Sequence, residues 1–213
     1  MHIDNSGRIT TVTIDDESTR NAVSHDTVNA LLEAVTQANE NPDTRVIVIK
    51  GAGDRAFASG ADLSEIAGAT VNFDGIVSYD QTLEDLYDTF AQIRVPIVAA
   101  VQAAAIGGGG LLALACDVRI AAEGAVFALP AAGIGLTISR REYRLVHERL
   151  GSSIARYLLL TGHRLDAFEL QRCGVFHQVV PAVEFADQVD RLARRIADLA
   201  PLALAATKST LHL

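Results

Sequence analysis

"AAAIGGGGLLALACD", residues Ala103–Asp117, places four consecutive glycines, Gly107–Gly110, directly before an apolar run that predicts a helix. Glycine destabilises regular elements, because it loses more conformational freedom on folding than any other residue. Two physical reasons can justify such a run. Small residues let a helix pack closely against a sheet or another helix, and bare backbone at a helix start leaves N–H groups open to an anionic ligand. The spacing by itself favours both equally.

A second glycine-bearing loop, "AFASGADL" (Ala56–Leu63), also lies between a predicted strand and a helix. Two helix starts that face one point would hold one developing oxyanion, as acyl-transfer and enolate chemistry require. Phosphate binding is a third interpretation of such loops. The chain disfavours it, because the template Gly-x-Gly-x-x-Gly is not matched and no Lys-Ser or Lys-Thr follows the glycines.

Strands and helices alternate around these two loops. Runs rich in β-branched or small apolar residues predict strands at Arg8–Asp15, Arg45–Gly51, Ile97–Val101, Asp117–Glu123, Ala125–Leu129 and Val175–Pro181. Apolar residues at helical spacing predict a helix capped by Ser24, a helix over Ile76–Ile93, and a mostly helical segment after Arg140. This alternation indicates the α/β class, in a single domain spanning residues 1–213.

The composition disfavours several classes of function. The 213 residues carry a net charge of −8, whereas a nucleic-acid partner requires a basic face. No apolar run reaches the ~18 residues of a membrane span, and the N-terminal stretch lacks a signal-peptide pattern. Cys116 and Cys173 stand in apolar surroundings, which predicts buried thiols in a reducing compartment. We therefore expect a cytoplasmic protein with no metal, no nucleic-acid partner and no membrane partner.

Four stretches carry a resemblance to a known family. They are "RNAVS" (Arg20–Ser24), Arg45–Ile66, Pro96–Thr137 and Leu160–Pro181, and they cover essentially the whole chain in order. In these stretches the chain resembles the crotonase superfamily, the enoyl-CoA hydratase/isomerase family. The resemblance implies a crotonase-like spiral of ββα units over residues 1–181. Residues 182–213 would begin a C-terminal helical region that family chains continue for a few dozen residues more.

The resemblance also implies ligands and assembly. The small-molecule partner would be an acyl-CoA thioester, with coenzyme A as part of the substrate and no other cofactor. The assembly would be a homotrimer or a dimer of trimers. Two backbone N–H groups would polarise the thioester carbonyl, and by alignment they belong to Ala61 and Gly108. Residues implied to line the substrate path are Arg20, Asn21, Ala22, Ala58, Ser59, Gly60, Asp62, Leu63, Ser64, Gly107, Leu111 and Ala131. Asp62 is expected to organise its own loop.

The chain departs from the family at the two positions where its hydratases carry glutamates. Here these positions are Leu111 and Ala131, whose side chains neither accept nor donate a proton. General acid–base catalysis supplies about 10²–10⁴-fold in rate. Hydration by two glutamates is therefore disfavoured, and Ala131 also disfavours a double-bond isomerase that uses a single acid.

A second departure replaces glycines that follow "GLT" in the family. The segment Ile138–Gly151 is bulky and charged here, and it makes Glu142 and Tyr143 candidates for relocated proton transfer. The alternative for Glu142 is a solvated side chain that pairs with Arg140 or Arg141. Weaker predictions fall on three other residues: a proton-transfer role for Asp80, a surface position for His147, and either a coenzyme A phosphate contact or a solvated position for Lys208.

Three functions follow from these observations. The first is an acyl-CoA enzyme, a lyase or isomerase of fatty-acid-type metabolism, whose reaction is an isomerisation, a hydrolysis, a decarboxylation or an atypical hydration. The second is a non-catalytic acyl-CoA-binding or scaffold homologue, which Leu111 and Ala131 favour. A nucleotide-binding protein is the third, and the missing phosphate-loop lysine disfavours it.

Overall fold

Two sheets organise the chain in the computed structural model, which describes residues 1–62, 64, 65 and 73–211. The larger sheet has the order β1 (His2–Ser6), β2 (Ile9–Ile14), β3 (Val46–Gly51), β5 (Ile97–Val101), β7 (Val118–Ala122), β10 (Gln178–Val180). The smaller sheet has the order β4 (Ala56–Ala58), β6 (Ala104–Ile106), β8 (Val126–Ala128), β9 (Arg164–Asp166). Pairing is parallel except between β1 and β2 and between β8 and β9.

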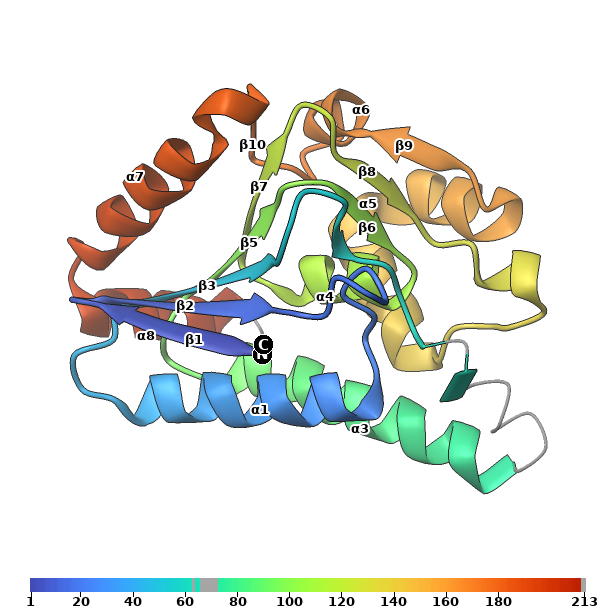
Figure 1. Cartoon of the computed structure of the whole chain (residues 1–213), viewed down its shortest axis with the longest axis horizontal. Coiled ribbons are helices and arrows are strands. Elements are labelled where there is room, and N and C mark those ends of the chain that lie inside the picture. The colour runs from blue at the N-terminus through green and yellow to red at the C-terminus, as the bar shows by residue number, and fades with distance from the viewer. Residues whose placement is uncertain (63, 66–72, 212–213) are drawn as a thin grey trace.

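The chain winds as a spiral in which each turn visits both sheets and then a helix (Figure 1). The turns are β3–β4 followed by α3 (Phe73–Gln92), β5–β6 followed by α4 (Gly108–Ala115), and β7–β8 followed by α5 (Arg140–Thr161). The expected spiral of ββα units is confirmed. The other helices whose bounds lie within the described residues are α1 (His25–Glu40), α6 (Ala167–Arg172), α7 (Phe185–Ala197) and α8 (Pro201–Leu211), with 3-10 turns at Ala131–Ile134 and Ala182–Glu184.

Both faces of the larger sheet are covered, which explains its dense β-branched strands. On β3, Ile47 and Ile49 point into the main core, whereas Val46 and Val48 point to the opposite face. That opposite face packs against α7, through Ala193, Ile196 and Ala197. Helices α1 and α3 lie side by side on the other side of the sheet (Figure 1).

Every predicted strand is present, but four strands were not predicted from the sequence. Three of them, β4, β6 and β9, contain only three residues each. Such segments are too short for alternation to be recognised, and "AFA" and "AAI" have no β-branched run. The fourth, β1, is a wholly exposed polar edge strand. The predicted helix start is confirmed, because the Ser24 side chain accepts the N–H of Thr27 at 3.1 Å.

Two predictions for single residues are corrected. Cys116 is buried as expected, but Cys173 is exposed, because it ends the short helix α6. Lys208 is neither solvated nor available to a phosphate. It is 5% exposed, and its Nζ lies 2.7 Å from Asp117 Oδ2 and donates to the Val95 carbonyl at 3.0 Å. Lys208 thereby links α8 to the residues just before β5 and β7.

His177 joins the start of β7 to the segment that precedes β10. The imidazole Nδ1 of His177 accepts the backbone N–H of Arg119 at 3.0 Å, and the backbone N–H of His177 donates to the Arg119 carbonyl at 3.0 Å. The ring is therefore neutral, with its proton on Nε2. Burial, followed by the charge of the Arg119 guanidinium, lowers the pKa of His177.

We expect the free energy of unfolding to decrease as pH falls below about 6.5, the pKa of an unperturbed histidine. Below this pH the unfolded chain binds the proton more readily than the folded chain. The contribution of His177 to the free energy of unfolding is therefore fully present above about pH 6.5 and is lost as the pH falls further. Because His177 is an exposed residue, solvent screening keeps the loss under about 1 kcal/mol. Urea unfolding from about pH 5.5 to about pH 7.5 measures it. His177→Asn keeps an acceptor that does not titrate, so equal pH slopes in the two proteins would contradict this assignment.

Among the described residues, no helix has the length and apolar character needed to cross a membrane. Nor does that part of the chain hold a group of three or more His, Cys, Asp or Glu side chains able to bind a metal ion.

Candidate functional site

Close packing requires two of the four glycines. A Cβ on Gly109 would lie 2.2 Å from the Ala58 carbonyl oxygen, so the helix backbone rests directly on β4. A Cβ on Gly110 would lie 2.9 Å from Cε2 of Phe127, a side chain of β8. Ala58, which the resemblance assigns to the substrate path, is itself fully buried beneath α4. The packing interpretation therefore holds for Gly109 and Gly110.

Gly107 is required for its backbone conformation. It precedes α4 with φ 52° and ψ −121°, a region that side chains with a Cβ rarely adopt. Its N–H donates to the Ala128 carbonyl at 2.8 Å, and its carbonyl accepts the N–H of Leu111 at 3.0 Å. These bonds fix the direction in which α4 leaves the smaller sheet.

Gly108 is different, because the space beside it is open toward a second backbone amide. The nearest atom to a Cβ at this position would be the Ala61 nitrogen, at 3.5 Å. Within the described part of the chain, neither the Gly108 N–H nor the Ala61 N–H donates to a protein acceptor. Both residues are only partly buried. The structure thus brings together the two amides that alignment selects, one at the start of α4 and one on the second glycine loop.

Hydrogen bonds from a neighbouring turn hold the loop that carries Ala61. The Val23 N–H donates to the Gly60 carbonyl at 2.8 Å, and the Ser59 N–H donates to the Arg20 carbonyl at 3.1 Å. Gly60 has φ 103°, and a Cβ there would lie 2.9 Å from the Ile106 carbonyl oxygen. The Ala61 amide is therefore positioned against α4 by backbone contacts on both sides of the loop.

The turn Arg20–Ala22 supports this loop through hydrogen bonds, and its backbone has an uncommon conformation. Arg20 and Asn21 both have φ 59°, which is uncommon outside glycine. Asn21 is buried, and its side-chain amide donates to the carbonyls of Ala52 and Ala56 while its Oδ1 accepts the Asp16 N–H. The Asn21 side chain is thus occupied within the protein, Ala22 is buried, and Arg20 is exposed.

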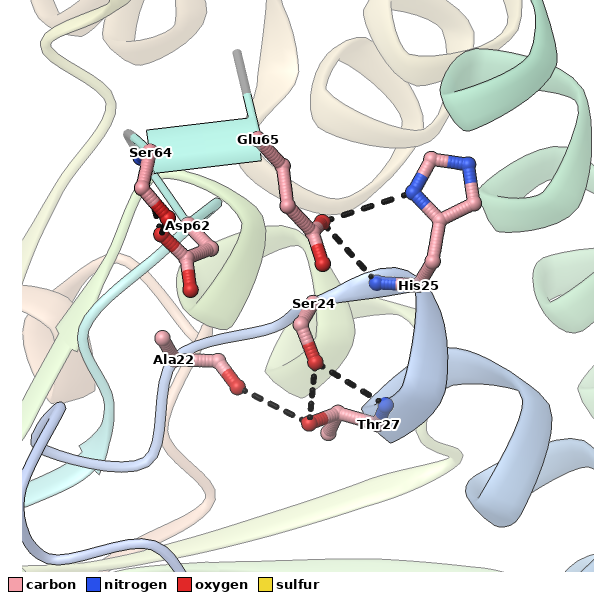
Figure 2. A network of polar contacts seen from close by, with 7 residues as sticks. All are labelled: Ala22, Ser24, His25, Thr27, Asp62, Ser64 and Glu65. Atoms are coloured by element: carbon pink, nitrogen blue, oxygen red, sulfur yellow. Dashed lines mark hydrogen bonds and ion pairs between the residues drawn. The ribbon is translucent and has the colours of Figure 1, made fainter. Parts of the chain in front are cut away.

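Figure 2 shows how the residues after Ala61 are held. Asp62 Oδ1 accepts the Ser64 N–H at 2.8 Å and the Ser64 hydroxyl at 2.7 Å. The bond from the Ser64 side chain, and then that from its backbone, lower the pKa of Asp62. Asp62 therefore organises its own loop, as expected. Leu63 lies outside the described residues, and so does the side chain of Asp80.

Sequence reasoning missed Glu65 and His25. Glu65 Oε2 accepts the backbone N–H of His25 at 3.1 Å and lies 3.4 Å from its Nδ1, at the start of α1 (Figure 2). A carboxylate at a helix N-terminus interacts favourably with the helix dipole. This contact anchors the second glycine loop to α1. No local sequence pattern predicts this contact, because the two residues lie far apart in the sequence.

The two positions of the family's glutamates hold apolar side chains in different surroundings. Leu111 is only 3% exposed and packs in the main core. Ala131 begins the 3-10 turn Ala131–Ile134 and is partly buried. Neither residue brings a titratable atom to the amide pair.

Glu142 is not solvated, so that prediction was wrong. It is buried, and its Oε2 accepts the Ser139 N–H at 2.8 Å while the Glu142 N–H donates to Ser139 Oγ at 3.2 Å. These reciprocal bonds form a capping box, and the Ser-x-x-Glu spacing was the signal that could have revealed it. Arg141 instead forms an ion pair with Asp88 of α3.

Tyr143 and His147 are exposed residues of α5. Tyr143 is exposed, and its ring centroid is 5.9 Å from that of His147. His147 is also exposed, as predicted. Of the two proton-transfer candidates, Glu142 serves the helix start and Tyr143 presents its ring to the surface.

Comparisons with known proteins agree with this architecture. The family model described as Enoyl-CoA hydratase/isomerase matches residues 4–213. The carnitinyl-CoA dehydratase of Proteus mirabilis is 34% identical over 209 residues, covering 98% of this chain and 78% of that protein.

Solved structures show the same spatial arrangement. An enoyl-CoA hydratase from Bacillus anthracis superposes with a TM-score of 0.93 at 30% identity, covering 99% of this chain and 81% of that chain. An enoyl-CoA hydratase/carnithine racemase from Magnetospirillum magneticum superposes with a TM-score of 0.95 at 30% identity, covering 98% and 78%. By its family match over nearly the whole sequence and by its spiral fold, the chain belongs to the enoyl-CoA hydratase/isomerase family.

Proposed function

We propose that the protein is an enzyme acting on acyl-CoA thioesters, which polarises the thioester carbonyl between the N–H groups of Ala61 and Gly108. The observation that carries the proposal is the juxtaposition of these two amides, both without a described protein acceptor. A thioester oxygen placed between them would receive two hydrogen bonds. Because the bonds strengthen as negative charge develops, they would stabilise an enolate more than the bound ester.

The helix behind Gly108 adds to this effect. Gly108 is the first residue of α4, and a helix N-terminus carries about half a positive charge. Donors of this kind are already oriented before the reaction, so they cost little reorganisation when charge develops. Removing one such donor typically costs about 10²–10³-fold in kcat.

Several reactions share such an oxyanion, and the residues at the site reduce the number of reactions that fit. Hydration by two glutamates is disfavoured by Leu111 and Ala131. Isomerisation, decarboxylation and atypical hydration stay within the proposal, because each can pass through a stabilised enolate. Hydrolysis also stays within it, because the same two amides would hold the oxyanion of its tetrahedral intermediate. The relatives named above include a carnitinyl-CoA dehydratase and enoyl-CoA hydratases, which supports thioester chemistry at this fold.

Of the two proton-transfer candidates, Tyr143 is the one whose side chain is not bonded into a helix start. The Glu142 carboxylate is buried and accepts the Ser139 N–H, so its use as a base would weaken the start of α5. The Tyr143 hydroxyl belongs to an exposed side chain and can donate a proton without that cost.

A non-catalytic acyl-CoA binder is the second candidate function. It is favoured by Leu111, which is a buried aliphatic where the family's hydratases place a glutamate. Such a protein would keep the amide pair for recognition of the thioester carbonyl and would turn over no ester.

Acetoacetyl-CoA tests the proposal without requiring a catalytic acid or base, because its enolate forms by exchange with solvent and absorbs ultraviolet light. We expect the bound ligand to titrate about one to two pKa units below the free ligand, which is a tenfold to hundredfold gain in the enolate ratio. Spectrophotometric pH titration with saturating protein measures this shift. We also expect crotonyl-CoA hydration at least about 100-fold slower than in a relative with both glutamates.

Butanoyl-CoA serves as the control, because it competes for the site but forms no absorbing enolate. Its addition should return the acetoacetyl-CoA spectrum to that of the free ligand. Calorimetric binding of acetoacetyl-CoA without any shift would contradict carbonyl polarisation. A shift without turnover of any enoyl-, β-keto- or malonyl-CoA ester would favour the binder over the enzyme.

A further inference from the structure

Arg119 is a buried arginine at the C-terminal end of α4. It is 4% exposed, and its Nη1 donates to the carbonyls of Cys116, Leu114 and Ala113 at 2.5, 3.3 and 3.4 Å. Its Nε donates to the Val175 carbonyl at 2.8 Å. Three of these four acceptors belong to the last turn of α4 or to the residue that follows it.

Two further cations gather at the same helix end. Arg149 of α5 donates from Nε to the Leu114 carbonyl at 3.3 Å. Lys208 forms the ion pair with Asp117, the second residue after α4. We call Arg119, Arg149, Lys208 and Asp117 the helix-end cluster.

The helix-end cluster carries a net positive charge inside an acidic chain. It has three cations and one carboxylate, and neither arginine forms an ion pair with a described carboxylate. Burial lowers the pKa of Arg119 to about 10, so the guanidinium remains charged near neutral pH. Burial also raises the pKa of the Cys116 thiol to about 12, so this thiol supplies no compensating negative charge.

A buried cation without a carboxylate is costly unless other groups replace its hydration. Here the replacement is the negative end of the α4 dipole, because the guanidinium is bound by the helix's own terminal carbonyls. The arrangement stabilises the helix and also changes its field. Cations at the negative pole cancel part of that pole, which leaves the positive pole at the other end less opposed.

That other end is the amide of Gly108. The helix has eight residues, so its two ends are separated by only about 12 Å. Its N-terminal turn consists of glycines, which have no side chains to anchor it. The bonds from Arg119 to the C-terminal turn are therefore well placed to fix the helix along its axis.

We propose that Arg119 is a positioning residue, which holds α4 by its C-terminal carbonyls and strengthens the positive field at the Gly108 amide. This inference rests on the proposed carbonyl polarisation between Ala61 and Gly108. It assigns a function in the reaction to a buried cation that does not touch the substrate. Arg149 contributes to the same field through Leu114.

The test compares Arg119→Met with Arg119→Lys by the acetoacetyl-CoA titration at saturating ligand. Arg119→Met removes the charge, so we expect the bound ligand's pKa to rise by about half to one unit, a threefold to tenfold loss of enolate. Arg119→Lys retains the charge, and its titration should lie close to that of the wild type. A role in overall stability alone, with no effect on the position or field of α4, would change the melting temperature or the fraction of protein that binds, but not the pKa of the bound ligand.

Arg156→Met is the matched control, because Arg156 is an exposed arginine of α5 whose side chain bonds Ser152. It should leave the titration unchanged. Where Arg119→Met does not fold, Arg149→Met takes its place with the same expected direction. An unchanged pKa in the folded charge-removing variant would overturn the inference, whereas the absence of any shift in the wild type would overturn the proposed function instead.

Discussion

Gly108→Ala is expected to abolish most of the activity while leaving the fold in place. The added Cβ would meet only the Ala61 nitrogen at 3.5 Å, together with Gly60 atoms at 3.8 and 3.9 Å. These are ordinary van der Waals distances, and φ at this position is not positive. The methyl group would nevertheless fill the gap between the two amides, where the thioester oxygen is proposed to bind. We expect kcat to fall by about 10²–10³-fold.

Stability should move in the opposite direction. Alanine is more favourable than glycine in a helix by about 1 kcal/mol, so the melting temperature should stay level or rise by a few degrees. Gly124→Ala is the matched control, because a Cβ there meets nothing within 4 Å and its φ is not positive. Steady-state kinetics and thermal unfolding of the two variants measure both effects. Wild-type kinetics in Gly108→Ala would show that the amide pair is not where the carbonyl binds.

The sequence alone left the cause of the glycine run ambiguous. Packing and ligand binding both favour glycine at a helix start, and local pattern cannot distinguish them. The distinction depends on atoms from elsewhere in the chain: the Ala58 carbonyl beside Gly109, the Phe127 ring beside Gly110, and the Ala61 amide beside Gly108. Within one run of four, the structure assigns different causes to neighbouring residues.

Elsewhere, local sequence patterns predicted correctly those features that depend on neighbouring residues. The Ser24 cap and the β-branched strands depend on nearby backbone, and both were found as expected. Glu142 was predicted wrongly although its capping box is local, because the surrounding arginines suggested ion pairs instead. The positions of Lys208 and Glu65 were out of reach, because their partners Asp117 and His25 are brought to them only by the complete fold.

Gly109→Ala should have the largest effect on stability. A Cβ at this position would lie 2.2 Å from the Ala58 carbonyl oxygen and 2.6 Å from its carbonyl carbon and Cβ. No rotamer change relieves this overlap, because the contact is with the backbone and Cβ of β4. The helix and the strand must separate, and overpacking of a core by backbone displacement costs about 3 kcal/mol. For a chain of this size we expect the melting temperature to fall by about 6–12 °C.

Gly110→Ala separates backbone contact from simple crowding. Its Cβ would meet the edge of the Phe127 ring at 2.9 and 3.1 Å and the Ala105 carbonyl oxygen at 3.3 Å, so the closest contacts are with a side chain, which can shift where a strand cannot. We therefore expect Gly110→Ala to lose only about 1 kcal/mol, between Gly109→Ala and the neutral Gly124→Ala. Because β4 leads directly into the loop that carries Ala61, Gly109→Ala should also lose activity in its folded fraction. If Gly109→Ala and Gly124→Ala had the same melting temperature, α4 would not rest on β4. The spacing of the two amides would then have to be set by other contacts.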